Sequence, residues 1–159
     1  AVNLARHLIN LPPNLLNPVT YSEFAAQLFK GKAGVKVEVW DETRLKKEKM
    51  NLHLAVGSGS NAPPALVHIQ WRPKGAKGLP VALVGKGITF DTGGLDIKPS
   101  TGMRLMKKDM GGSAAVLGTA MWAVASGLKV NLDVYLALAE NAVSDKSFRP
   151  SDVVTARNG

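Results

Sequence analysis

The sequence contains no cysteine, few aromatic residues and no long apolar run. Without cysteine the chain has neither a disulfide nor a thiolate metal site, which fits a reducing compartment. No segment approaches ~18 uninterrupted apolar residues, so we expect no membrane-spanning helix. The first six residues, Ala-Val-Asn-Leu-Ala-Arg, lack the basic leader and apolar stretch of a secretory signal, and we expect no such signal there.

Acidic residues are also scarce: the chain has 12 Asp and Glu but 20 Lys and Arg, which gives it a net charge of +8. A basic surface of this kind can bind nucleic acid. The lysines are scattered along the chain, however, and are not interleaved with aromatic residues as in a base-stacking platform. We favour a solvated basic surface, with a nucleic-acid patch and the loss of an acidic part of a larger protein as the alternatives.

What is present suits one α/β domain. The chain has 159 residues and is 45% apolar, which is enough for a single core. Alternating strand and helix patterns favour a mostly parallel sheet flanked by helices. We find no internal repeat. Strands are predicted at residues 35–40, 66–71, 81–90 and 130–139, and helices at 2–10, 21–30, 42–49 and 113–126.

Two helix boundaries and one loop have clear sequence signals. Thr20, with Glu23 three residues later, has the spacing of a capping box and is predicted to be an N-cap. Gly127 is a natural residue to end the helix that Ser113 opens. Residues 91–112 form a loop of about twenty residues with little periodicity, and loops of that length in a compact domain are usually functional or disordered.

Charged residues follow the central strand, where ligands bind in parallel α/β sheets. The strand runs into Lys86 between two glycines and then delivers Asp91. The twin glycines 93 and 94 permit a tight turn, after which Lys98 and Asp109 lie on the long loop. Glu140 ends the next strand at the same edge of the sheet. Such charge at the end of a buried strand predicts a binding site.

The chemistry of these residues suits a divalent cation. Asp91 and Asp109 are hard oxygen donors, and Lys86 could ligate only after losing its proton, which a nearby metal promotes. Lys98 could stay charged and polarise a carbonyl or stabilise an oxyanion. The alternative is a set of ordinary ion pairs. Met106 and its neighbouring methionines could line an apolar substrate pocket or simply fill the core.

Two segments closely resemble the leucyl aminopeptidase (cytosol aminopeptidase) family. They are residues 85–99, Gly-Lys-Gly-Ile-Thr-Phe-Asp-Thr-Gly-Gly-Leu-Asp-Ile-Lys-Pro, and 106–115, Met-Lys-Lys-Asp-Met-Gly-Gly-Ser-Ala-Ala. Supporting matches lie at residues 5–14, 54–60, 140–141 and 148–152. The resemblance implies a zinc-exopeptidase-like domain in a cytoplasmic, typically hexameric enzyme. It also implies removal of N-terminal residues, often leucine, from peptides with the help of two divalent ions, Mn²⁺ or Zn²⁺.

The resemblance assigns a role to each matched position. Lys86, Asp91 and Asp109 look like ligands of one metal, and Asp91 would also bridge to the second. Lys98 looks like the catalytic lysine that polarises the scissile carbonyl. Met106 looks like part of the pocket for the side chain of the released residue. No cofactor other than the two metal ions is implied.

The sequence departs from the family in extent. The family's remaining ligands lie in an Asn-Thr-Asp-Ala-Glu-Gly-Arg motif, which the 159 residues do not contain. By resemblance, residues 1–12 are the end of an inter-domain linker helix and 13–159 are the N-terminal half of the catalytic domain. We therefore expect an aminopeptidase as parent protein and a weakly active or inactive chain alone. The alternatives are a DNA-binding or a scaffold role of an aminopeptidase-like protein.

Overall fold

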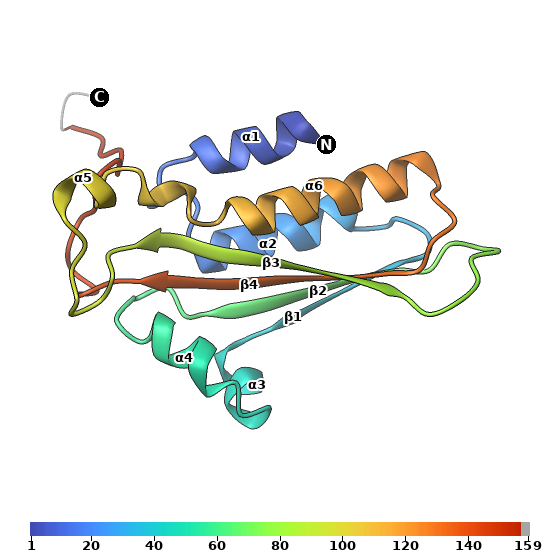
Figure 1. Cartoon of the computed structure of the whole chain (residues 1–159), viewed down its shortest axis with the longest axis horizontal. Coiled ribbons are helices and arrows are strands. Elements are labelled where there is room, and N and C mark those ends of the chain that lie inside the picture. The colour runs from blue at the N-terminus through green and yellow to red at the C-terminus, as the bar shows by residue number, and fades with distance from the viewer. Residues whose placement is uncertain (157–159) are drawn as a thin grey trace.

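A computed structural model describes residues 1–156 of the chain. Its centre is a four-stranded sheet with helices on both faces: α1, α2 and α6 on one, and α3 and α4 on the other (Figure 1). The strands are β1 (Val35–Trp40), β2 (Ala65–Trp71), β3 (Val81–Asp91) and β4 (Leu132–Asn141). The helices are α1 (Val2–Asn10), α2 (Pro18–Phe29), α3 (Glu42–Lys47), α4 (Asn51–Gly57), α5 (Ser100–Met103), the 3-10 helix η1 (Met106–Lys108) and α6 (Gly111–Ser126).

The strands run in the order β1-β2-β4-β3. The expectation that β3 is a central, buried strand is wrong, because β3 is at one edge of the sheet and its first residues are largely exposed. The β3–β4 pair is parallel, whereas β1–β2 and β2–β4 are antiparallel. The α/β class with flanking helices is confirmed, but the sheet is mixed rather than mostly parallel. The helices between β1 and β2 have only six and seven residues, too short to carry the chain back along a whole strand. The chain therefore re-enters the sheet at the end where it left.

The main core lies between the sheet and the layer formed by α1, α2 and α6. Leu8 of α1, Tyr21 of α2 and Leu117 of α6 are fully buried there against inward residues of β2 and β4. The predicted apolar face of the first helix is confirmed, because Leu4 and Ile9 pack on the same cluster. None of the helices within residues 1–156 is both long and apolar enough to cross a bilayer. This core fixes α6 over the parallel β3–β4 pair, where the candidate site lies.

The ends of two helices test the sequence signals. The N-cap of α2 is Asn17, whose side-chain oxygen accepts hydrogen bonds from the backbone of Val19 (3.0 Å) and Thr20 (3.1 Å). The prediction of Thr20 as N-cap is thus wrong, because Pro18 needs no N–H partner and occupies the first helical position. Gly127, with a φ of 64°, ends α6 as predicted.

The long segment after β3 is more ordered than its composition predicts. It contains the single turn α5 and the 3-10 helix η1, and α6 begins at Gly111, two residues before the predicted start. The segment curls over the carboxyl ends of β3 and β4, at the left of Figure 1. It therefore brings loop residues to the edge where the strands deliver theirs.

Candidate metal centre

The end of β3 presents Asp91 beside the end of β4. The two strands pair in regular parallel register from Val81 to Ile88, and the register then shifts before Asp91 pairs with Asn141. Such an irregularity re-aims the side chains that follow it. Lys86, five residues earlier on β3, projects outward with 61% of its side chain exposed.

The turn after Asp91 brings Lys98 back to the strand. Gly93 and Gly94 have φ values of 89° and 71°, so the glycine-dependent turn predicted from the sequence is confirmed. A Cβ on Gly93 would lie 2.3 Å from the carbonyl oxygen of Asp96. The backbone N–H of Lys98 donates a hydrogen bond to the Thr92 carbonyl at 2.9 Å, which closes the turn. The Lys98 ammonium then lies 2.9 Å from Asp91 Oδ2.

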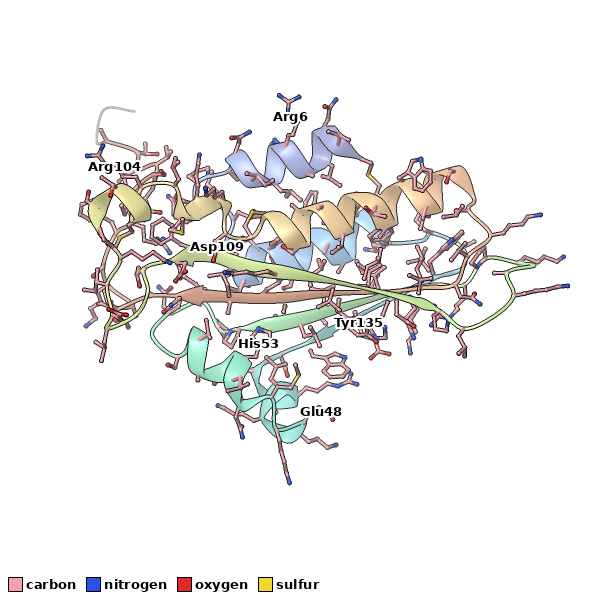
Figure 2. The ribbon with its side chains drawn as sticks, viewed as in Figure 1. Arg6, Glu48, His53, Arg104, Asp109 and Tyr135 are labelled. Atoms are coloured by element: carbon pink, nitrogen blue, oxygen red, sulfur yellow. The ribbon has the colours of Figure 1, made fainter. Side chains whose placement is uncertain are left out.

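A close contact between α6 and β3 brings Asp109 to Lys86. A Cβ on Gly85 would lie 2.5 Å from Ser113 Cα, and a Cβ on Gly112 would lie 3.0 Å from the backbone N of Lys86. The start of α6 thus rests directly on the backbone of β3. Asp109, two residues before α6, lies on the α6 side of the sheet in Figure 2, and its Oδ2 is 2.8 Å from Lys86 Nζ.

Lys86, Asp91, Lys98 and Asp109 therefore form one cluster, called here the Asp91 cluster. Burial raises the pKa of Asp91, but hydrogen bonds from Lys98, Gly93 and Asn141 outweigh this and leave the pKa below its usual value. The same contact raises the pKa of Lys98, with a smaller contribution from the charge of Asp109. At neutral pH Asp91 is therefore ionised and Lys98 is protonated.

One oxygen of the cluster is buried and accepts no hydrogen bond. Asp109 Oδ2 lies close to Lys86 Nζ, yet outside hydrogen-bonding geometry, and no other group within residues 1–156 donates to it. Burial of a carboxylate oxygen is costly, and the Lys86 ammonium is the cation that offsets it here. Within that same part of the chain, no group of three or more His, Asp or Glu side chains gathers. The donors that the cluster can offer a divalent ion are therefore two carboxylates and, once Lys86 is deprotonated, one amine.

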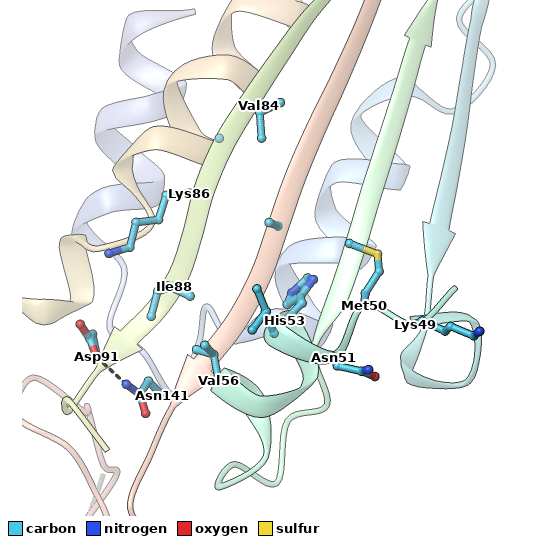
Figure 3. Close-up of a pocket in the computed structure, with 13 residues that line it drawn as sticks. Lys49, Met50, Asn51, His53, Val56, Val84, Lys86, Ile88, Asp91 and Asn141 are labelled. Atoms are coloured by element: carbon cyan, nitrogen blue, oxygen red, sulfur yellow. Dashed lines mark hydrogen bonds between the residues drawn. The ribbon is translucent and has the colours of Figure 1, made fainter. Parts of the chain in front are cut away.

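An open groove of about 820 Å³ runs from the cluster along the sheet between β3 and α4 (Figure 3). Lys86, Asp91 and Asn141 line one end, and apolar side chains such as Val84, 71% exposed, line the rest. His53 of α4 also lines it. Its Nε2 donates to the Leu138 carbonyl at 2.8 Å, so Nδ1 is left buried without a partner. The sequence contained no signal for this histidine.

Two other predicted residues lie outside the Asp91 cluster. Met106 is on η1, partly buried, and does not line the groove beside Lys86. Glu140 is at the predicted strand end but is buried, where Arg149 and the Ser60 hydroxyl donate to its two oxygens. Its neighbour Asn141, which belongs to the family match at residues 140–141 but was given no role there, donates instead to Asp91.

Part of the basic surface is neutralised locally. Lys36 and Arg44 both pair with Glu38, and Lys46 pairs with Glu42. These pairs agree with the solvated surface that the scattered lysines favour.

Comparisons with known proteins converge on one family. The family model described as the cytosol aminopeptidase family, catalytic domain, matches residues 3–159. A probable cytosol aminopeptidase from Agrobacterium fabrum is 47% identical over 158 residues, which cover 99% of this chain and 31% of that protein. The chain therefore spans about a third of the length of the curated relatives it matches.

Solved structures show the same likeness. An apo leucyl aminopeptidase from Trypanosoma cruzi superposes with a TM-score of 0.84 and 38% identity, covering 93% of this chain and 29% of that one. A bottromycin maturation enzyme in complex with Mn has a TM-score of 0.81 and 38% identity, covering 98% and 33% of the two chains.

Proposed function

Because this chain belongs to the cytosol aminopeptidase family, we propose that the protein of which it forms a part is a metallo-aminopeptidase. It releases N-terminal amino acids, leucine-like ones in particular, from peptides. The observation that carries the proposal is the Asp91 cluster, in which the four charged residues of the family-like motif form two ion pairs, Lys98 with Asp91 and Lys86 with the buried Oδ2 of Asp109.

The proposal gives the two carboxylates and Lys86 the role of metal ligands. Asp91 and Asp109 would be the hard donors that hold one divalent ion, and Asp91 would also help to hold a second. Lys86 becomes a ligand by losing its proton, since an ammonium has no lone pair. The chemistry of this donor set suits Mn²⁺ or Zn²⁺. The Mn complex of a structural neighbour supports the same choice.

The remaining residues act on the substrate. Two bound ions would supply an activated water and Lewis-acid polarisation of the scissile carbonyl. Lys98 keeps its proton, because Asp91 raises its pKa, and offers a fixed positive charge to the same carbonyl oxygen. Met106 contributes apolar surface for the side chain of the released residue.

The extent of the chain limits what it does alone. It spans about a third of its curated relatives, and its 159 residues lack the Asn-Thr-Asp-Ala-Glu-Gly-Arg motif. We assign residues 1–12 to the end of a linker helix and 13–159 to the N-terminal half of the catalytic domain. The 159-residue chain then has little or no activity, and the intact protein is a cytoplasmic homo-oligomer, a hexamer.

A peptidase assay tests the proposal in both forms. The intact protein with Mn²⁺ hydrolyses leucine p-nitroanilide, its Asp91→Ala variant loses metal and rate together, and the 159-residue chain shows little or no turnover. The Asn131→Ala variant is a control, because the Asn131 side chain donates to the Gly78 carbonyl at the other end of the sheet.

Two outcomes contradict the proposal. Robust turnover by the 159-residue chain refutes the account of missing ligands. An intact protein that neither binds Mn²⁺ nor turns over, but retains duplex DNA in a salt-dependent way, supports the DNA-binding alternative instead.

A further inference from the structure

We propose that Asn141 is a positioning residue that orients Asp91 for metal binding and leaves Oδ2 as its free oxygen. The inference rests on the proposed function, because it assigns a role toward the metal. It starts from the hydrogen bond that joins the ends of β3 and β4 in Figure 3, from Asn141 Nδ2 to Asp91 Oδ1 at 2.9 Å.

The two oxygens of Asp91 have different surroundings. Oδ1 accepts a second hydrogen bond from the backbone N–H of Gly93 at 3.0 Å. Each carboxylate oxygen has about two lone pairs for acceptance, so these two donors occupy Oδ1. Among the described residues 1–156, Oδ2 is paired with the Lys98 ammonium alone, 2.9 Å away. The Lys98 side chain can move away from Oδ2 when another cation takes its place. The donors on Oδ1, by contrast, are the Gly93 backbone and the Asn141 side chain, which the fold holds in place.

The orientation of the Asn141 amide follows from chemistry. The ionised carboxylate of Asp91 is an acceptor only, so the amide must turn its NH₂ group toward it. The side-chain oxygen of Asn141 lies on the other side of the amide, close to Gly94. A Cβ on Gly94 would come within 3.3 Å of this Asn141 oxygen. Gly94 therefore leaves room for the amide in the one orientation that binds Asp91.

The backbone of Asn141 is held as firmly as its side chain. Its carbonyl accepts hydrogen bonds from the backbone N–H of Thr92 at 2.9 Å and from the Thr92 hydroxyl at 2.8 Å. The preceding residue, Glu140, is buried and fixed by Arg149 and Ser60. Asn141 thus connects a rigid strand end to a carboxylate, as partners behind metal ligands do.

The test is the affinity for Mn²⁺, measured by calorimetry on the intact protein and on the 159-residue chain. We expect Asn141→Leu, similar in size but without a donor, to weaken Mn²⁺ binding about 10–100-fold, the usual effect of losing such a partner. Asn141→Gln, which keeps an amide donor, recovers part of the affinity. Asn131→Leu is the matched control and leaves the affinity unchanged.

Each other result has a defined meaning. If Asn141→Leu lowers the melting temperature but binds Mn²⁺ within twofold of wild type, Asn141 is merely structural and the inference is overturned, while the proposed function stands. If the wild-type intact protein binds no Mn²⁺, the proposed function fails and the inference fails with it. If Asn131→Leu weakens binding as much as Asn141→Leu, the effect is not specific to Asp91 and the inference is also overturned.

Discussion

The sheet carries two clusters of charged side chains, and they differ in how completely they close on themselves. The Asp91 cluster lies where β3 ends. The second, called here the Asp133 cluster, consists of three residues. Asp133 lies near the start of β4, His68 lies in β2, and Arg72 directly follows β2. Both contain a largely buried aspartate within a sheet, so sequence composition alone does not distinguish them.

The Asp133 cluster is saturated. Arg72 donates to both carboxylate oxygens of Asp133, at 2.8 and 2.9 Å, and His68 Nε2 lies 2.9 Å from Oδ1. The His68 ring in turn stacks on Tyr135, with ring centres 4.3 Å apart. Every oxygen of Asp133 is thus satisfied by a partner that is itself held in place, which is the arrangement of a structural ion pair.

The Asp91 cluster is left open by comparison. Its two lysines approach carboxylates, but no group in the described part of the chain makes a hydrogen bond to Asp109 Oδ2, and Lys86 is largely exposed. The difference teaches that satisfaction of the acceptors, rather than the presence of charge, separates a candidate ligand site from a structural pair. Four predictions follow that comparison.

The largest effect is expected from exchanging the two aspartates for alanine. Asp91→Ala should weaken Mn²⁺ binding by more than about 100-fold, since losing a ligand costs more than losing a partner behind it. Asp133→Ala should leave Mn²⁺ affinity unchanged and lower thermal stability instead. Calorimetric titration with Mn²⁺ and a thermal melt of each variant separate the two effects, and equal losses of affinity would erase the distinction.

Filling the contact between α6 and β3 should disturb only one of the clusters. In Gly85→Ala the new Cβ would meet the backbone of Ser113 at 2.5–2.7 Å, so α6 must move and carry Asp109 away from Lys86. We expect a loss of about 1–3 kcal/mol in the free energy of unfolding, as for other overpacked sites, together with weaker Mn²⁺ binding. Urea unfolding measures the first quantity.

Gly102→Ala serves as its control, because nothing lies within 4 Å of a Cβ at that position. A Gly85→Ala protein as stable as the control would mean that α6 does not rest on β3 as described.

The Asp133 cluster should affect how the free energy of unfolding changes with pH in the acid range. Burial raises the pKa of Asp133, but hydrogen bonds from His68 and Arg72 outweigh it and lower the pKa below its usual value. A lowered folded-state pKa stabilises the protein above the unfolded value of about 3.9, and that contribution disappears as the pH falls through the folded value. Asp133→Asn should therefore be less stable than wild type near pH 6, with a difference that narrows below about pH 4.

Chemical unfolding between pH 6 and pH 3 measures that difference. If it stays constant over the whole range, the carboxylate does not contribute through its charge.

The smallest change in Mn²⁺ affinity is expected for Lys98→Met. The partly exposed Lys98 ammonium competes with a cation for Asp91 Oδ2, so its removal should raise Mn²⁺ affinity, by less than about tenfold because water screens a partly exposed ion pair. In the intact protein the same change should abolish most of the hydrolysis of leucine p-nitroanilide. A large fall in Mn²⁺ affinity would show that Lys98 supports the metal rather than the substrate.

Much of the fold follows from local patterns in the sequence. Alternation in residues 35–40 and the apolar run before Asp91 correctly placed β1 and β3, and Gly127 ended α6 because it accepts a positive φ. Strand direction did not follow, because alternation carries no information on which end of the sheet a short connection returns to. The N-cap of α2 was misplaced since Thr20 and Asn17 both suit the position, and Pro18 decides between them.

The site was predictable in its members but not in its contacts. A recognisable motif named Lys86, Asp91, Lys98 and Asp109, and the structure brings these four together. The partner Asn141 is fifty residues from Asp91, and only the β3–β4 register brings the two amino acids together. His53 was missed for the same reason, because its bond to Leu138 depends on how α4 packs on β4.

The position of β3 at the sheet edge has a practical consequence for the chain on its own. Within residues 1–156 no strand pairs with the outer side of β3. Val81 and Val84, which belong to this strand, are 49% and 71% exposed. Free amides and carbonyls beside exposed valines form a template for a strand of another molecule. Solubility of the isolated polypeptide should therefore fall steeply with concentration, and light scattering during concentration will detect that onset.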